Sequence, residues 1–338
     1  MRETPTQSEA VLPPWLAPNW ERLSRARAAD RLPHALLIVG PRGVGKRLLA
    51  QRLVHALLCP SPLPDGAACG RCPDCRLVKA GSHQDLIRVG PDPESKSGEI
   101  PIDAIRDLRD RAILTAGRGG RVLVVIDPAD RMNVAAANAL LKTLEEPPGP
   151  VLLCLIAEAL GRLPATVRSR CQRLTLAVPP AEAALRWLNE QLAGKGDGAR
   201  LLDIAHGAPL RALELAAEGQ LEARTRCLQG LEAVSTGSTD PLAVAQAWQS
   251  LEPGLVLDWL AGWVSDRLRL GVDPGVKHLT NPDQRRALAS IAPGLEPRQG
   301  HHYLRQIYAA RAQATSTVNK QLLFESLLLR WAQLSRSA

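Results

Sequence analysis

The chain has 338 residues, 45% of them hydrophobic, and a formal net charge of +8 from 42 Lys and Arg against 34 Asp and Glu. This length exceeds one compact core of ordinary size, so two or three domains are expected. No apolar run approaches a membrane span, and Met1–Ala10 lacks a signal-peptide core, so we expect a soluble, cytoplasmic protein. The basic excess fits a DNA-facing stripe or solvated helix faces equally well.

A glycine-rich loop follows the first expected strand, Leu36–Val39. The residues that fit the phosphate-binding spacing G-x-x-x-x-G-K are Gly40, Gly45 and Lys46, with a further glycine, Gly43, between them. A helix is predicted from Lys46 to Leu58, so backbone N–H groups at its start would surround phosphate oxygens. Arg47 stands where a working loop has Ser or Thr to hold Mg²⁺, and a guanidinium has no lone pair for a metal. The sequence therefore predicts a degenerate nucleotide site.

Four cysteines follow with the spacing C-x9-C-x2-C-x2-C, namely Cys59, Cys69, Cys72 and Cys75. The Gly and Pro within the last three let the backbone curl, so the thiolates converge in the manner of a closed, structural zinc site. An iron–sulfur cluster and unliganded buried thiols are the alternatives. The other three cysteines, Cys154, Cys171 and Cys227, are expected to be small core residues.

A second nucleotide motif ends the expected strand Val122–Ile126. Asp127 stands where a Walker B aspartate holds Mg²⁺ through water. Pro128 follows, at a position where many such ATPases have a glutamate that orients the attacking water. Both halves of the hydrolytic machinery are incomplete, although a true ATPase with Mg²⁺ held by water and Asp127 alone is the alternative.

The remaining pattern alternates strands with helices and then becomes helical. The other expected elements before residue 178 are strands Asp85–Val89 and Val151–Ile156, helices Ile102–Ala112 and Asn133–Leu144, and a loop at Pro91–Gly98. The expected helices beyond it are Ala181–Leu192, Gly198–His206 and Leu210–Ala217, followed by a loop at Ser235–Pro241 and further helices with Trp248, Trp259, Trp263 and Trp331 as core anchors. We therefore predict domains at 1–178, 179–220 and 221–338, the first a parallel sheet flanked by helices.

Two further segments carry a family resemblance. Asn138–Pro148, which reads NALLKTLEEPP, resembles the helix after Walker B in bacterial clamp-loader subunits, and Ser169–Cys171 resembles their S-R-C motif. Together with the cysteine module and the helix signal at Asn319–Leu328, the chain resembles the delta-prime clamp-loader subunits of DNA polymerase III over nearly its whole length. The resemblance implies an α/β AAA+ P-loop domain with a zinc module, a small helical lid domain and an all-α collar domain for oligomerisation.

The resemblance also implies a function. Arg170 would be an arginine finger that acts in trans on the ATP of a neighbouring subunit, while the chain itself is a non-catalytic stator. The implied partners are gamma or tau and delta subunits, the sliding clamp and primed DNA, in a hetero-oligomer. Ala157 stands at the expected sensor position. The alternative is an active ATPase like gamma or tau, and ATP or ADP binding by the degenerate loop stays open.

Other classes of function are disfavoured. A stand-alone zinc-dependent DNA-binding module would need a basic recognition helix after the cysteines, which the sequence lacks. Polymerase (nucleotidyltransferase) activity would belong to the holoenzyme, because no acidic polymerase metal site is recognisable.

Overall fold

The computed structural model describes residues 12–92, 98–114, 121–194, 196–217, 219–314 and 319–336. The chain divides into two compact units, one of Met1–Trp187 with Ala208–Arg211 and one of Leu188–Gly207 with Ala212–Ala338. The domain boundaries expected after residues 178 and 220 stay predictions. None of the helices in the described part of the chain is long and apolar enough to cross a membrane.

The first unit is built on a five-stranded parallel sheet in the order β2-β3-β4-β1-β5. Its strands are β1 (Ala35–Val39), β2 (Leu86–Val89), β3 (Val122–Ile126), β4 (Val151–Ala157) and β5 (Gln172–Thr175). Four of these were predicted, within a residue at each end. The fifth, β5, was not expected, because only Leu174 among its four residues is buried.

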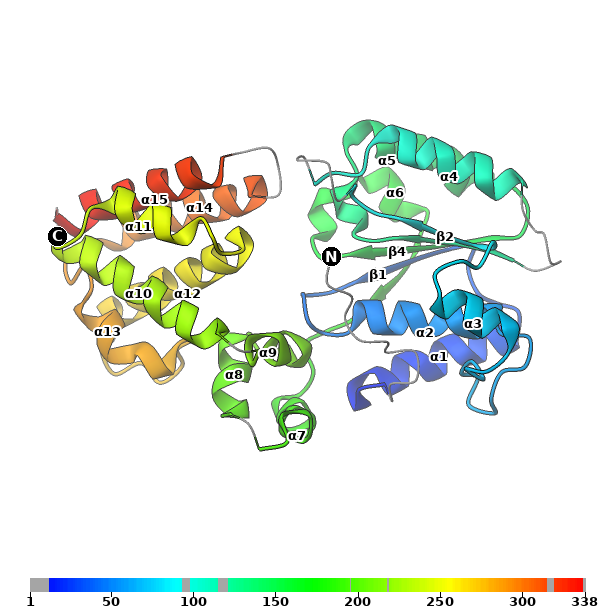
Figure 1. Ribbon diagram of the computed structural model, residues 1–338, viewed down its shortest axis with the longest axis horizontal. Coiled ribbons are helices and arrows are strands. Elements are labelled where there is room, and N and C mark those ends of the chain that lie inside the picture. The colour runs from blue at the N-terminus through cyan, green and yellow to red at the C-terminus, as the bar shows by residue number, and fades with distance from the viewer. Residues whose placement is uncertain are drawn as a thin grey trace. The chain divides into compact units, whose positions relative to one another are not determined.

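Helices cover both faces of this sheet (Figure 1). One face carries α1 (Ala17–Ala28), α2 (Lys46–Leu58) and α3 (Pro73–Lys79), and the other carries α4 (Ile102–Leu114), α5 (Val134–Glu145) and α6 (Ala165–Ser169). Alternate residues of each strand face opposite cores, as Leu36 and Leu37 of β1 do. Because both faces are covered, the central strands are continuous apolar runs rather than alternating ones.

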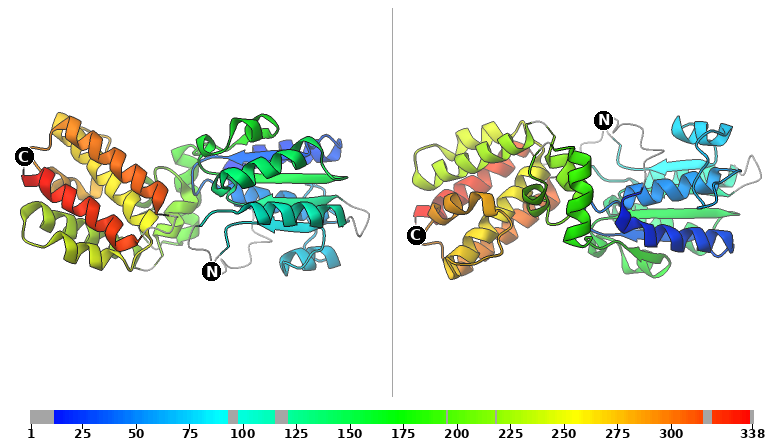
Figure 2. Two further views of the ribbon diagram at one scale, coloured as in Figure 1. Left: turned by 90° about the horizontal axis from the view of Figure 1, so that it is seen from above. Right: turned by 90° about the horizontal axis from the view of Figure 1, so that it is seen from below.

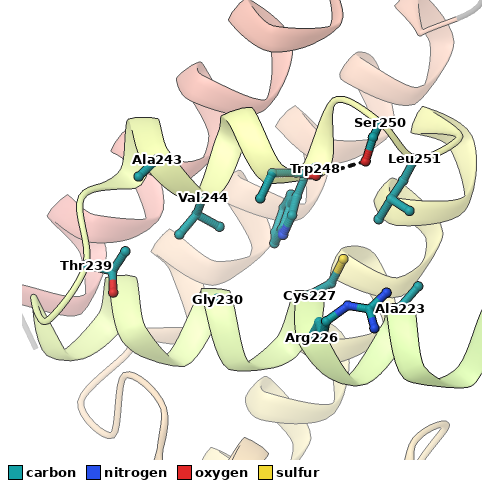
Figure 3. Close-up of a pocket in the computed structure, with 11 residues that line it drawn as sticks. Ala223, Arg226, Cys227, Gly230, Thr239, Ala243, Val244, Trp248, Ser250 and Leu251 are labelled. Atoms are coloured by element: carbon teal, nitrogen blue, oxygen red, sulfur yellow. Dashed lines mark hydrogen bonds between the residues drawn. The ribbon is translucent and has the colours of Figure 1, made fainter.

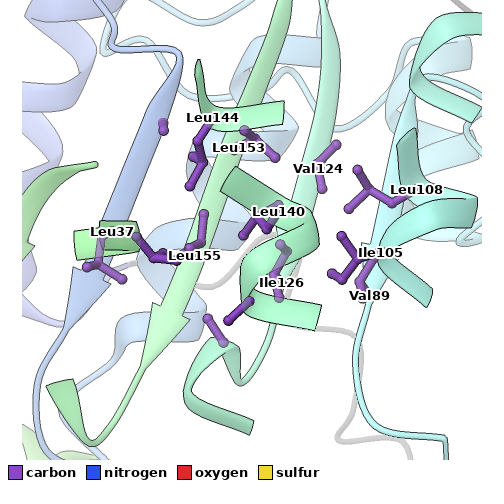
Figure 4. Close-up of a cluster of buried hydrophobic side chains, with 14 of the residues drawn as sticks. Leu37, Val89, Ile105, Leu108, Val124, Ile126, Leu140, Leu144, Leu153 and Leu155 are labelled. Carbon is purple, nitrogen blue, oxygen red and sulfur yellow. The ribbon is translucent and has the colours of Figure 1, made fainter. Parts of the chain in front are cut away.

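Helix α5 is fixed to the sheet by its apolar face. Leu140 and Leu144 lie among Leu153 and Leu155 of β4 in one buried cluster (Figure 4). Asn133 caps the start of the helix, since its side-chain oxygen accepts a hydrogen bond from the N–H of Ala136 at 2.8 Å. The expected helix Asn133–Leu144 is therefore confirmed with a shift of one residue.

The second unit is helical, and Figure 2 shows its long helices running beside one another. The helices from residue 181 onward are α7 (Ala181–Leu192), which begins in the first unit, α8 (Gly198–Ile204), α9 (Pro209–Leu215), α10 (Gln220–Thr236), α11 (Pro241–Trp248), α12 (Pro253–Val272), α13 (Arg285–Ser290), α14 (Pro297–Gln313) and α15 (Lys320–Arg336). All four expected tryptophan anchors are buried. Most of the loop expected at Pro91–Gly98 lies outside the described residues.

The loop expected at Ser235–Pro241 begins later than predicted. Helix α10 continues to Thr236, and Gly237 ends it with a left-handed φ of 71°. Ser235 stays helical because its hydroxyl donates to the Leu231 carbonyl at 2.9 Å and accepts from Trp331 Nε1 at 2.7 Å. The expectation of a loop at Ser235 and Thr236 was wrong, because a distant tryptophan supplies the partner that a serine otherwise seeks in a turn.

A buried ion cluster lies inside the second unit. The Arg224 side chain of α10 is fully buried and donates to Asp283 Oδ2 at 2.9 Å and to Asn281 Oδ1 at 2.6 Å. Arg200 of α8 donates to the same Asp283 oxygen from Nε and from one terminal nitrogen, at 3.1 and 2.9 Å. Burial alone would raise the pKa of Asp283, but hydrogen bonds and charge from Arg224, with Arg200, hold it below the usual value.

A pocket of about 360 Å³ opens between α10 and α11 (Figure 3). Cys227 and Gly230 line it from one helix, and Val244 and Trp248 line it from the other. Among the described residues that line this pocket, Arg226 is the one charged side chain. The lining thus offers apolar contact but no pair of groups for acid–base chemistry.

Candidate functional site

The phosphate-binding loop has the backbone form that its glycines permit. Gly43 and Gly45 adopt left-handed φ values of 81° and 102°, and Gly45 caps the start of α2. A Cβ on Gly43 would lie 2.5 Å from Arg211 Cβ, and one on Gly45 would lie 2.7 Å from Leu16 Cδ1. A side chain at either position would strain the left-handed backbone and force a neighbouring group to shift.

Other parts of the first unit also hold the loop. Trp15 Nε1 donates to the Val44 carbonyl at 2.9 Å, and the N–H of Leu210 donates to the Gly43 carbonyl at 3.1 Å. The Trp15 ring in turn packs edge-on against Trp187, with 5.2 Å between ring centroids. The sequence motif did not reveal these contacts, because the contacting residues are distant from the loop in the sequence.

Lys46 is turned toward its own loop. Its Nζ donates to the carbonyls of Gly40 and Pro41 at 2.7 and 2.8 Å, and the side chain is buried. Burial, with the adjacent Arg47 charge, lowers the pKa of Lys46 against the opposing effect of the nearby carboxylates of Glu158, Asp130 and Asp127. Contact between Lys46 and a terminal phosphate, expected from the motif, stays a prediction.

Arg47 and Asp127, the two altered nucleotide-motif positions, meet in space. Arg47 Nε donates to Asp127 Oδ2 at 2.6 Å, with the arginine mostly exposed and the aspartate largely covered. In a working site this carboxylate faces Mg²⁺, whereas here it faces a guanidinium. The other oxygen, Asp127 Oδ1, is buried and has no hydrogen-bond partner within the described part of the chain.

The residues around Asp127 supply little hydrolytic chemistry. Pro128 follows it and has neither a carboxylate nor a backbone N–H. Asp130 is already engaged, since its oxygens accept the N–H groups of Glu158 and Ala159 at 3.1 and 3.0 Å. Ala157, at the expected sensor position, is buried at the end of β4 and pairs in register with Val39.

Arg170 lies between the short helix α6, which it ends, and the strand β5. Its guanidinium donates to the Thr166 carbonyl at 3.0 Å and pairs with Glu145 Oε1 at 2.5 Å. The side chain is 37% exposed. Glu145 stands in the quoted NALLKTLEEPP segment, but its pairing with Arg170 was not predicted.

The four clustered cysteines converge on one point. Their Sγ atoms all lie within 4.8 Å of one another, and Cys69 Sγ lies 4.0 Å from Cys75 Sγ. Tetrahedral zinc with Zn–S bonds of about 2.3 Å needs sulfurs about 3.8 Å apart, so the donor set fits that ion. Two sulfurs also accept backbone N–H groups at 3.3 Å, Cys59 from Cys69 and Cys72 from Cys75.

Thiol electrostatics are compatible with a cation at this point. Backbone hydrogen bonds from Arg71 and Cys72 lower the pKa of Cys69 to about 6. Burial raises the pKa of Cys59 and Cys75, and a bound cation would oppose that effect by favouring the thiolates. Burial also raises the pKa of Cys154, which is consistent with a small core residue.

The segment between Cys59 and Cys69 is fastened to α1 and α2. The Asp65 carbonyl accepts from Trp20 Nε1 at 3.2 Å, and its carboxylate accepts from Arg52 at 3.0 Å. Arg27 donates to the Gly66 carbonyl at 2.7 Å. These contacts hold the cysteine module against the body of the first unit.

The strand order, the glycine loop after β1 and the aspartate after β3 together define a P-loop domain of the AAA+ class. Residues 16–180 match the family model described as DNA polymerase III, delta subunit, and residues 218–333 match that described as DNA polymerase III, delta subunit, C terminal. The chain therefore belongs to the delta' family of DNA polymerase III clamp-loader subunits.

Two curated relatives agree with this assignment. The chain is 35% identical to DNA polymerase III subunit delta' of Pseudomonas aeruginosa over 328 residues, covering 95% of this chain and 97% of that protein. It is 35% identical to the Escherichia coli K12 subunit delta' over 320 residues, covering 94% of each. A gamma subunit-related protein of Thermotoga maritima, solved by crystallography, is 18% identical with a TM-score of 0.45, covering 93% of this chain and 99% of that one.

Proposed function

We propose that this clamp-loader subunit does not hydrolyse ATP itself and instead lends Arg170 to ATP bound by a neighbouring subunit. In this role it would complete a hetero-oligomeric, cytoplasmic assembly with gamma or tau and delta subunits that places a sliding clamp on primed DNA. The observation that carries the proposal is the Arg47–Asp127 ion pair. Arg47 has no lone pair with which to hold Mg²⁺, and it occupies an oxygen of the carboxylate that would otherwise face the metal.

Several contacts support the loss of intrinsic hydrolysis. Lys46 is satisfied by two carbonyls of its own loop, and Pro128 cannot orient water. Restoring hydrolysis would require a free lysine, a metal ligand and a base together.

Arg170 retains the means to act on a neighbour. Its guanidinium has five N–H donors, and its partly exposed position leaves room for phosphate oxygens. A finger supplied in trans accelerates nucleotide hydrolysis by roughly 10³ to 10⁵ in well-studied systems. Because the chain's own loop is degenerate, an arginine that acts on ATP has this use only across an interface.

The Cys59, Cys69, Cys72 and Cys75 cluster is proposed to hold one structural zinc. Four thiolates leave the metal no open position for water, so it would stabilise the module without taking part in chemistry.

The competing function is that of an active ATPase, favoured by the preserved glycine geometry and by the presence of Lys46 and Asp127. ATP turnover separates the two functions. The purified chain is assayed alone and after mixing with its partner subunits, in wild-type form and as Lys46→Ala. We expect no turnover by the chain alone and equal turnover by complexes with either form. Turnover by the wild-type chain that Lys46→Ala abolishes would establish the active ATPase instead.

A further inference from the structure

Arg170 is held from two sides by its own chain. One terminal guanidinium nitrogen donates to the Thr166 carbonyl at 3.0 Å, within α6. The other pairs at 2.5 Å with an oxygen of Glu145, the last residue of α5. Because the two acceptors lie on different helices, they restrain both the position and the plane of the guanidinium.

Both anchors rest on packed elements. Leu140 and Leu144 fix α5 against the sheet, and Val167 of α6 is fully buried in the same core cluster. The ion pair itself lies at the surface, with Arg170 37% and Glu145 50% exposed. An arginine side chain with four rotatable bonds would sample many rotamers at such a place without a partner. Glu145 thus places a negative charge beside the guanidinium of Arg170.

The contact leaves donors free. Two of the five N–H groups of a guanidinium serve Thr166 and Glu145, so three can still donate to an incoming phosphate. Glu145 and a phosphate can therefore bind the same guanidinium at once. A group placed in advance of the transition state accelerates a reaction more than one that must be ordered during it.

We propose that Glu145 is a positioning residue that orients Arg170 for the ATP of the neighbouring subunit. The inference rests on the proposed function, since it assumes that Arg170 acts in trans. Glu145 itself touches no nucleotide in this account. Loss of the carboxylate should slow the adjoining site about fivefold, the size of effect that a partly exposed ion pair supports.

The test uses the reconstituted complex with its clamp and primed DNA. Four variants of this chain are compared with wild type: Arg170→Ala, Glu145→Ala, Glu145→Gln and Glu146→Gln. Glu146→Gln is the matched control, because it removes the same charge from the next, exposed residue, which has no described ion pair. Stimulated ATPase is measured as kcat and KM at equal incorporation of the variant subunit.

Arg170→Ala should remove almost all of the ATPase rate of the adjoining site. Glu145→Ala, which slows that site about fivefold, should remove about four-fifths of the same contribution. Most of this loss should be in kcat, with KM for ATP unchanged, because orientation matters chiefly in the transition state. Glu145→Gln should lose less, since its amide oxygen can still accept a hydrogen bond. Glu146→Gln should match wild type, and Glu145→Ala combined with Arg170→Ala should be no slower than Arg170→Ala.

The results distinguish the role of Glu145 from the role of Arg170. Reduced activity of Arg170→Ala with normal activity of Glu145→Ala would overturn the role of Glu145 and leave the finger intact. A faster Glu145→Ala complex would also overturn it, because the carboxylate would then restrain the finger. Unchanged rates for Arg170→Ala would overturn the proposed function and this inference together.

Discussion

In the buried ion cluster of the second unit, Asp283→Ala and Arg200→Ala should lower the free energy of unfolding by very different amounts, although each breaks an ion pair at Asp283. Asp283→Ala removes the carboxylate partner of Arg224 and leaves Asn281 Oδ1 as its acceptor; Arg224 is 0% exposed, and its Nε already has no partner within the described residues. Removing one member of a buried pair costs about 3–5 kcal/mol. Arg200→Ala removes a pair whose arginine is 40% exposed, and Asp283 keeps its bonds from Arg224. That change should cost less than about 1 kcal/mol.

Urea unfolding at neutral pH, followed by tryptophan fluorescence, measures both costs. The second unit contains four of the seven tryptophans, so its transition is visible in that signal. Combining Asp283→Ala with Arg224→Ala should cost less than the sum of the single changes, because the two side chains share one interaction. If Arg200→Ala and Asp283→Ala lowered the free energy of unfolding equally, burial of the arginine would not determine how much each ion pair contributes.

The same ion cluster determines how the stability of the fold depends on pH. The folded pKa of Asp283 lies below its ordinary value of 3.8. The unfolded chain therefore takes up this proton at a higher pH than the folded chain does. The contribution of Asp283 to stability is fully present above the ordinary pKa and is lost as the pH falls through the folded value.

Two further predictions concern the first unit. The purified chain should contain one zinc per molecule. The double change Cys72→Ser and Cys75→Ser should abolish zinc binding and lower the thermal stability. Elemental analysis that finds no zinc, or iron in its place, would refute this assignment. Arg47→Thr should remain folded, because it breaks a mostly exposed pair worth about 0–1 kcal/mol, yet it should not hydrolyse ATP while Pro128 is present. Clear turnover by Arg47→Thr alone would show that the arginine was the one obstacle.

The fold was largely predictable because its strongest signals are local. The central strands are apolar runs buried on both faces, and α2 and α7 coincide with their predicted ranges. The edge strand β5 has exposed polar residues at three of its four positions, so no hydrophobic pattern marks it.

The site was predictable residue by residue but not as an arrangement. Spacing identified Arg47 and Asp127, yet they are 80 positions apart, and only the order of the strands brings them into contact. The pairing of Glu145 with Arg170 depends likewise on α5 and α6 packing on one face of the sheet. The motifs therefore identified these residues, whereas tertiary packing determines which of them form ion pairs.

The most direct test of the central claim compares Arg170→Ala with Arg168→Ala in the reconstituted clamp-loader complex. Arg168 is an exposed arginine of α6, two residues before Arg170, so its change removes equal charge without removing the proposed finger. Clamp-stimulated ATPase is measured at equal incorporation of each variant. We expect Arg170→Ala to lose the contribution of the adjoining ATP site, with the other sites still active, and Arg168→Ala to match wild type. Equal rates for both variants and wild type would contradict the claim that this chain lends Arg170 to its neighbour.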